Sequence, residues 1–545
     1  MRKKNLTHKS STFKPNLIVL LIPIISGMVV FGLIFTGRYQ QRVSQTGANR
    51  LETDGWQLAQ DQFKAAMPEY GRKYAYYKVK ERQDITAVAS HFGVPVETLA
   101  RLNPGTIVAG TTVKITPLES PMKPLETTNG LLAQSRIIVE NNIVHVKQDF
   151  KNSKITTNLP ELVSLLAGYG VFEQTGPKSY RLMKSLSIED NIRLDITNQT
   201  VDTLELNSPP GQSVCLCSEN AELLIKGIKI TSYDPATKGP DKNPADERSF
   251  IRALKSARMD ILNSDISYLG NGLHTSSAPI QREGGTYGVS WRIPDDMLGV
   301  DIVTGWIENN QFHNNYFGSY TYGASGMVWQ QNRFSFNEVY GLDPHDDSNN
   351  ALIENNTFDH NGKHGFIVSK RCNYNVINNN KSYSNGLHGF MLHQDSSYNI
   401  FENNLAYDNT DNFAIYASDY NAVRNNRSYN PKGSHLRINE QTNNTFVTGN
   451  VFGGGGHGVY IYGDSTNTYV ADNIFRKTKD IVITNGARNV FVSTNIIDRL
   501  AYKLKDGDRI IFGPNIVQRN SLDLPDGVDV LRSLSSSKTD ESDQE

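Results

Sequence analysis

One short run concentrates side chains that could do acid/base chemistry: Tyr340-Gly341-Leu342-Asp343-Pro344-His345-Asp346-Asp347-Ser348. A histidine near its ordinary pKa exchanges protons at neutral pH, and carboxylates beside it can orient it or bind a polar substrate. The run therefore predicts a catalytic or binding site, provided that a scaffold holds these side chains in place.

The scaffold is visible as a ladder of asparagines. They recur at gaps of 22 to 24 residues, at Asn310, Asn332, Asn356, Asn380, Asn404, Asn426, Asn450, Asn473 and Asn495. A fixed period in this range indicates a solenoid. Stacked asparagines can hydrogen-bond one another and the backbone of buried turns, so we expect them to have a structural role.

Each repeat contains short apolar runs, such as Phe366-Ile367-Val368 and Phe390-Met391-Leu392, separated by Gly, Asn, Asp and Ser. This pattern is typical of strands and turns and has no helical period. A unit of this size can bury its apolar side chains only by stacking on its neighbours, at about 4.8 Å per coil. The sequence therefore predicts an all-β fold, a right-handed parallel β-helix over residues 136–526.

Alternation along a strand places every second side chain on one face. On this rule Asp343, His345 and Asp347 face one way, whereas Pro344 and Asp346 face the other. Proline removes one hydrogen bond from a sheet ladder, so Pro344 indicates an edge or an irregularity in the sheet.

Stacked neighbours follow from the period, because 24 residues separate Asn356, Asn380 and Asn404. Adding 24 places Ser369 and then His393 in the column of His345. The same step places Arg371 next to Asp347. A histidine flanked by carboxylates, with an arginine one coil away, could perform acid/base work on a carboxylate-bearing substrate.

The N-terminus predicts a membrane anchor. Residues 1–16 are basic, residues 17–36 form an apolar stretch without charge, and residues 37–75 form a polar, partly helical spacer. Twenty apolar residues can span a bilayer, and the basic flank favours a cytoplasmic N-terminus with an extracytoplasmic body. A cleaved signal peptide is the alternative. We expect the tail, residues 527–545, to be disordered.

Composition excludes some classes of function. The formal net charge is −1, which argues against a nucleic-acid binder and requires a local basic groove for any anionic substrate. The three cysteines, Cys215, Cys217 and Cys372, have neither zinc nor redox spacing, so we expect them to be buried apolar residues without a disulfide framework.

Residues 76–117 read as strand, helix, helix and strand, at 77–80, 84–92, 96–103 and 112–117. With Tyr77-x-Val79, Asp84-Ile85, Phe92-x-Val94, Leu102-Asn103 and Gly110, this segment resembles a small α+β LysM domain. The resemblance implies contact with peptidoglycan. Residues 118–135, rich in Pro, Ser and Thr, form the predicted linker.

The run from Tyr340 to Ser348 resembles the YG-x-DPHD-x-S signature of the mannuronan C-5-epimerases. Segments 230–234, 249–251 and 287–291, and the two His-Gly-Phe triplets at His364 and His388, resemble the periplasmic members that act in alginate biosynthesis. The resemblance implies conversion of β-D-mannuronate to α-L-guluronate within a polymer, by loss and return of the C5 proton. It implies an anionic polyuronate substrate, and an exopolysaccharide synthesis or secretion complex as a possible partner.

The resemblance also suggests roles. We expect His345 to be the base that removes the C5 proton. Arg371, on the predicted face of His345, would neutralise the substrate carboxylate, and Lys370 is the rival cation. Tyr340 or a water would return the proton, and Asp343 would fix the His345 tautomer or bind substrate. Asp-rich calcium repeats are absent from the sequence, so we predict no metal or other cofactor.

Further residues are predicted to contact the substrate: Asp346, Asp347, Ser348, Lys370, His364, His388 and His393. Three other functions remain open. A polyuronate lyase would form the same carbanion and expel the 4-linked sugar. A glycoside hydrolase would use two carboxylates from Asp343, Asp346 and Asp347. A membrane-anchored polysaccharide-binding protein would need none of this chemistry.

Overall fold

The structure is a computed structural model that describes residues 57–523, with gaps at 81–82, 93, 129, 149–153, 273–285, 300, 498–499, 502–509, 513–515 and 518–521. The predicted membrane segment at 17–36 and the predicted disordered tail at 527–545 lie outside the described residues. Within the described part of the chain, no helix is long and apolar enough to cross a membrane.

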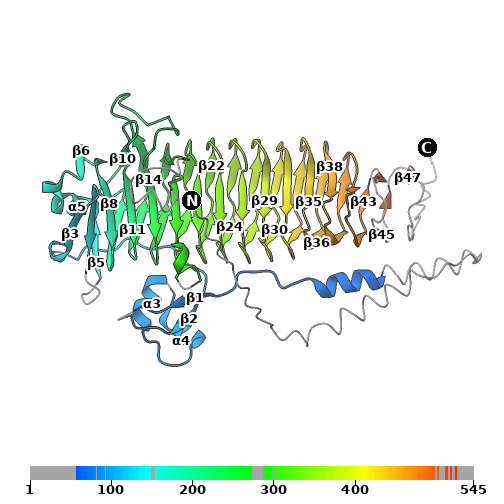
Figure 1. Cartoon of the computed structure of the whole chain (residues 1–545), viewed down its shortest axis with the longest axis horizontal. Coiled ribbons are helices and arrows are strands. Elements are labelled where there is room, and N and C mark those ends of the chain that lie inside the picture. The colour runs from blue at the N-terminus through cyan, green and yellow to red at the C-terminus, as the bar shows by residue number, and fades with distance from the viewer. Residues whose placement is uncertain are drawn as a thin grey trace, which may run out of the picture. The chain divides into compact units, whose positions relative to one another are not determined.

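Three long sheets run side by side along the solenoid (Figure 1). The first sheet holds β3 (Arg136–Glu140), β4 (Ile143–Lys147), β8 (Ser185–Glu189), β11 (Cys215–Glu219), β14 (Phe250–Leu254), β17 (Val289–Arg292), β20 (Ser319–Tyr322), β23 (Leu342–His345), β26 (Phe366–Ser369), β29 (His388–His393), β32 (Asp411–Tyr416), β35 (Ser434–Asn439), β38 (His457–Ile461) and β41 (Val482–Ile483). The second holds β5 (Ile155–Asn158), β9 (Ile192–Thr197), β12 (Glu222–Lys226), β15 (Arg258–Leu262), β18 (Trp306–Glu308), β21 (Val328–Gln330), β24 (Leu352–Glu354), β27 (Val376–Asn378), β30 (Ile400–Glu402), β33 (Ala422–Arg424), β36 (Asn443–Thr448), β39 (Thr466–Ala471), β42 (Val490–Ser493) and β45 (Ile510–Phe512). The third holds β6 (Phe172–Gly176), β7 (Ser179–Leu182), β10 (Thr203–Asn207), β13 (Lys229–Tyr233), β16 (Asp265–Ser267), β19 (Gln311–His313), β22 (Arg333–Ser335), β25 (Thr357–Asp359), β28 (Lys381–Tyr383), β31 (Leu405–Tyr407), β34 (Arg427–Tyr429), β37 (Val451–Gly453), β40 (Ile474–Arg476), β43 (Ile496–Ile497) and β46 (Ile516–Val517).

The chain visits the three sheets in turn and pairs each strand in parallel with the strand one coil later, as β23 does with β26. This is a parallel β-helix, as predicted. Antiparallel pairs occur at its N-terminal end, between β3 and β4 and between β6 and β7. Helix α5 (Leu159–Leu165), whose N-cap Asn158 accepts from the Glu161 amide, adds two fully buried leucines to the core there.

The asparagine ladder has the predicted structural role. The Asn380 amide and side-chain Nδ2 both donate to Asn404 Oδ1, at 2.9 and 3.0 Å, and Nδ2 also donates to the Ile353 carbonyl at 2.8 Å. Asn380 in turn accepts from the Asn356 amide and side chain. A second buried ladder, which the sequence reading missed, runs through Asn315, Asn337, Asn361, Asn385 and Asn409.

Asn380→Ala should lower the free energy of unfolding by about 3 kcal/mol, because it leaves several buried donors and acceptors without partners. Urea denaturation would measure the change. Asn379→Gly is the matched control: Asn379 is exposed and has a φ of 53°, which glycine adopts freely, so its loss should cost less than about 0.5 kcal/mol. Equal effects of the two substitutions would contradict a structural ladder.

The predicted strand–helix–helix–strand module is present as β1 (Ala75–Lys78), α3 (Ile85–Phe92), α4 (Val96–Leu102) and β2 (Thr112–Ile115), with β1 and β2 antiparallel. Its own small core contains Tyr77 and Leu99, and Ile302 of the β-helix belongs to the same apolar cluster. Lys80 of the module also pairs with Asp301 at 3.1 Å. The module is therefore packed onto the β-helix through both apolar and charged contacts.

The segment before the module also contacts the β-helix. Residues 57–66 form a helix, and the Phe63 ring lies with its centroid 5.5 Å from that of Tyr469 in β39. Further on, Arg72 Nε donates to the Asn350 carbonyl at 2.8 Å. The segment thus contacts coils that are far apart along the solenoid.

One expectation about cysteines is wrong. Cys215 and Cys217 form a disulfide on β11, where they pack against Phe250 on the outer face of the first sheet. The reading from spacing failed because alternation brings residues i and i+2 to the same face of a strand. Cys372 is buried and free, as expected.

Candidate active site

His345 is the last residue of β23 and lies in an outward-facing column of the first sheet. Strand register places it between Tyr322 and Ser369, followed by His393 and Tyr416. The predicted stacking of His345, Ser369 and His393 is confirmed.

The two residues after His345 leave the strand. Asp346 and Asp347 have φ values of 29° and 58°, in the left-handed region, so the side chains no longer alternate. The expectation that Asp346 faces away from His345 is therefore wrong: Asp346 Oδ2 makes a short contact with His345 Nδ1. Asp346 therefore stands where it can hold the imidazole tautomer, one of the two roles predicted for Asp343, the other being substrate binding.

Arg371 is already paired. Its Nη2 donates to Asp346 Oδ1 at 2.8 Å and to Asp347 Oδ2 at 2.9 Å, and its Nε lies 3.2 Å from both Asp347 oxygens. These carboxylates raise the pKa of Arg371, so it stays charged. The predicted Asp347–Arg371 neighbour pair is confirmed, but Arg371 turns toward the two carboxylates and does not contact His345 directly.

Lys370 differs from Arg371 in that its side-chain ammonium has no hydrogen bond or ion pair among the residues that the structure describes. Its positive charge nevertheless lies close enough to lower the pKa of both His345 and Asp343. It also lowers the pKa of His393. Among the two predicted cations, Lys370 is thus the one left available to a substrate carboxylate beside His345.

The electrostatics favour a neutral imidazole at His345. Burial lowers its pKa, and the charges of Lys370 and Arg371 lower it further, while Asp346 opposes the shift. The neutral tautomer in which Nδ1 donates to the Asp346 carboxylate leaves the lone pair on Nε2. His345 therefore has the protonation state and the tautomer that a general base requires.

Asp343 is only 2% exposed, and its Oδ1 has no hydrogen-bond partner within the described part of the chain. Burial raises its pKa well above the usual range, although the Ser369 hydroxyl and Lys370 act in the opposite direction. Its strand neighbour on the preceding coil is Tyr320. A neutral carboxylic acid with an unpaired oxygen can donate a hydrogen bond to negative charge that develops nearby.

A column of stacked rings lies at the N-terminal end of this strand. Tyr340 lies between Phe317 and His364, with ring centroids 4.8 and 5.0 Å away, and His364 stacks on His388 at 4.9 Å. Burial raises the pKa of Tyr340 to about 12, so its hydroxyl is protonated at neutral pH. Burial lowers the pKa of His364 to about 2, so it is an uncharged member of the stack.

His388 belongs to a second polar cluster. Arg437 Nη2 lies 2.8 Å from His388 Nε2, and Arg437 Nη1 lies 3.3 Å from Asp411 Oδ2. Arg437 and Asp411 were not singled out from the sequence. Counting coils would have found them, because Arg437 lies in the same outward column as Asp343, four coils later.

Tyr320 and Tyr322 were also not singled out from the sequence, and counting coils would have found them too. They stand one coil before Asp343 and His345, 23 residues earlier, and the Tyr320 ring lies 5.6 Å from the imidazole. Ser348, in contrast, is buried and its hydroxyl donates to the His345 carbonyl. The structure therefore places Ser348 inside the turn and not on the surface that a polymer would contact.

A hollow of about 540 Å³ opens beside the cations, lined by Asp346, Lys370, Arg371, Gln394, Asp395, Tyr416, Ala417 and Glu440. It spans several coils, so an extended ligand could lie along the solenoid axis. In the described part of the chain, no three His, Cys, Asp or Glu side chains are grouped so that they could hold a metal ion.

Comparison with known proteins agrees with this description. Residues 295–405 and 345–497 match a family described as a right handed beta helix region, which confirms the predicted hand. The mannuronan C5-epimerase of Pseudomonas aeruginosa is 29% identical over 204 residues, 36% of this chain and 34% of that protein. The mannuronan C5-epimerase AlgG of Azotobacter vinelandii is 34% identical over 188 residues, 33% of each chain. The chain thus matches about a third of the length of these relatives.

A crystal structure of the periplasmic alginate epimerase AlgG has a similar fold, with a TM-score of 0.53 and 21% identity, and the match covers 69% of this chain and 84% of that one.

Proposed function

We infer that this protein, whose chain is related to the mannuronan C5-epimerases, is a polysaccharide-modifying isomerase. It inverts C5 of β-D-mannuronate residues within a polymer and so gives α-L-guluronate. The observation that carries the proposal is the arrangement at the end of β23: a neutral His345 oriented by Asp346, with Lys370 free beside it. An anionic polyuronate such as mannuronan is the proposed substrate.

The proposed reaction begins when His345 Nε2 takes the C5 proton. The electrons of the C5–H bond move into the adjacent carboxylate, whose added negative charge needs nearby cations or donors. Lys370 would neutralise this charge, and the protonated Asp343 would donate a hydrogen bond to it. Return of a proton to the opposite face of C5 re-forms the C–H bond with inverted configuration. Tyr340, which is protonated and lies two residues before β23, or a water would supply that proton.

Proton NMR on polymannuronate incubated with the purified full chain in heavy water tests the proposal. Guluronate signals carrying deuterium at C5, in a polymer of unchanged length, are the expected result. Unsaturated chain ends would instead indicate a lyase, which makes the same carbanion but expels the 4-linked sugar. An unchanged polymer would favour a binding protein.

We further propose an extracytoplasmic location, with the N-terminal apolar segment, residues 17–36, as a single-pass anchor in the inner membrane. A periplasmic relative supports the location. The strand–helix–helix–strand order of residues 75–115 supports a LysM-like module that would bind peptidoglycan. An exopolysaccharide synthesis or secretion complex would be the cellular partner.

The acid limb of the rate profile should lie below the ordinary imidazole pKa of about 6.5. Burial and cations lower the pKa of His345, so the base stays unprotonated until the pH falls through that lowered value. Asp346→Asn removes the carboxylate that opposes the shift, so the limb should move to still lower pH while kcat falls. Initial rates between pH 4 and 9 would measure both effects. A limb that moves to higher pH would contradict the assigned role of Asp346.

A further inference from the structure

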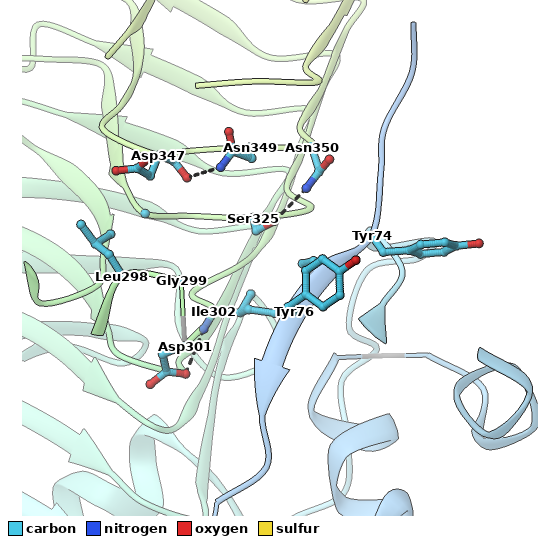
Figure 2. A pocket seen from close by; sticks show the side chains of 12 residues that line it. Tyr74, Tyr76, Leu298, Gly299, Asp301, Ile302, Ser325, Asp347, Asn349 and Asn350 are labelled. Carbon is cyan, nitrogen blue, oxygen red and sulfur yellow. Dashed lines mark hydrogen bonds between the residues drawn. The ribbon is translucent and has the colours of Figure 1, made fainter. Parts of the chain in front are cut away.

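A second hollow lies on the other side of the Asp347–Arg371 pair, between the N-terminal module and the β-helix (Figure 2). Its volume is about 350 Å³, near the lower end of the range of about 300–1,000 Å³ that holds small ligands. The lining residues are Tyr74, Ala75, Tyr76, Leu298, Gly299, Asp301, Ile302, Gly323, Ser325, Asp347, Asn349 and Asn350.

Both walls of the hollow are held in place. On the module side, Lys80 pairs with Asp301 at 3.1 Å and donates to Asn220 Oδ1 at 2.7 Å. On the β-helix side, Asn350 accepts from the Lys73 amide at 2.8 Å and its Nδ2 lies 3.3 Å from Ser325 Oγ. Because the contacts cross from one wall to the other, the hollow exists before any ligand binds.

The chemistry of the lining suits a sugar. Tyr74 and Tyr76 are 47% and 54% exposed, so their rings are open to a ligand. The C–H faces of a pyranose stack on aromatic rings, and its hydroxyls need acceptors and donors at the ring edge. The side chains of Ser325, Asn349 and Asn350, which line the hollow, carry such donors and acceptors.

The lining of this hollow offers no cation to a uronate. Its described members include no lysine or arginine, and its two carboxylates, Asp301 and Asp347, already pair with Lys80 and Arg371. The hollow on the other side of Arg371 is lined by Lys370 and Arg371. An anionic sugar would thus be attracted to the second hollow, whereas the first suits an uncharged one.

We propose that the hollow between the module and the β-helix binds one or two residues of a neutral glycan, with Tyr76 as the stacking platform. This site is distinct from the proposed catalytic groove: Asp347 lines this hollow, and its partner Arg371 lines the groove. It does not depend on the proposed epimerase activity, because its ligand is a different, uncharged polysaccharide.

Isothermal titration of the purified full chain with cellotetraose and with tetra-N-acetylchitotetraose tests the proposal, with tetramannuronate as the charged comparison. At least one neutral probe should bind, and Tyr76→Ala should weaken that binding at least tenfold. Tyr76→Phe, which keeps the ring, should restore it. Tyr169→Ala removes a tyrosine of similar exposure, 39%, outside the hollow and should change nothing.

Ser325→Tyr fills the hollow from the β-helix side without altering the module, and it should abolish the binding that Tyr76 supports. If that binding persists, the ligand sits on the module alone and the proposal is wrong. Failure of both neutral probes to bind, or Tyr76-dependent binding of tetramannuronate, would equally overturn it. Epimerase activity measured on the same samples keeps this outcome separate from the proposed function.

Discussion

Replacing His345 with glutamine should lower kcat on polymannuronate by about 10³-fold, because general base catalysis contributes about 10²–10⁴-fold and no second neutral imidazole lies in the same position. Glutamine keeps the volume and the polarity of the side chain but cannot accept the C5 proton. The exchange of deuterium into C5 should fall by the same factor, because proton removal precedes both exchange and inversion.

His360→Gln is the matched control. His360 also contacts a neighbouring carboxylate, with Nδ1 2.9 Å from Asp359 Oδ2, but it follows a strand of the third sheet, away from β23. Its loss should leave kcat unchanged. Circular dichroism and thermal unfolding should be the same for both variants and the parent. If the His345 variant keeps more than a tenth of the parent activity, a different group is the base.

Lys370→Gln should lower kcat by about 10²–10³-fold, the range typical of losing one group that stabilises developing negative charge. It should also move the acid limb of the rate profile to higher pH, since the Lys370 charge lowers the pKa of His345. Arg371→Gln should lower kcat only about tenfold, through a less constrained Asp346. The Arg371 charge also lowers the pKa of His345, so the acid limb should move the same way in both variants. Steady-state kinetics over a range of pH would therefore separate the two residues by the size of the loss in kcat.

The comparison decides between two cations that differ by one position in the chain. A purely structural role for Lys370 would leave the acid limb where it is. A larger loss in the Arg371 variant would mean that its pairs with Asp346 and Asp347 open when the polymer binds. That result would mean that Arg371 neutralises the substrate carboxylate, as strand alternation first suggested.

The solenoid and the column of His345 could be predicted because both depend on periodicity. Parallel pairing at a period of 24 residues fixes which residues stack, and Ser369 and His393 lie where counting placed them. The directions in which the side chains of Asp346 and Asp347 point could not be predicted from the period. These two residues adopt left-handed backbone angles, which end the alternation along the strand. The partner of the imidazole was misassigned for that reason.

The spacing of residues in the sequence also does not show which of two basic side chains is free to bind a substrate. Lys370 and Arg371 are both basic and adjacent, and only the placement of side chains shows that Arg371 already bonds two carboxylates. The packing of the N-terminal module onto the β-helix had no sequence signal either, because Lys80 and Asp301 lie more than 200 residues apart. Contacts between distant segments depend on the assembled fold.

The helix at residues 57–66 has a consequence for the order in which the protein assembles. Synthesis delivers this helix first, yet the Tyr469 ring against which Phe63 packs follows it by about 400 residues. The coils can stack one upon another as they emerge, whereas this contact must wait until nearly all of them have formed. Docking of the helix is thus a late step that marks a nearly finished solenoid, and a chain interrupted before β39 would leave it without its binding surface.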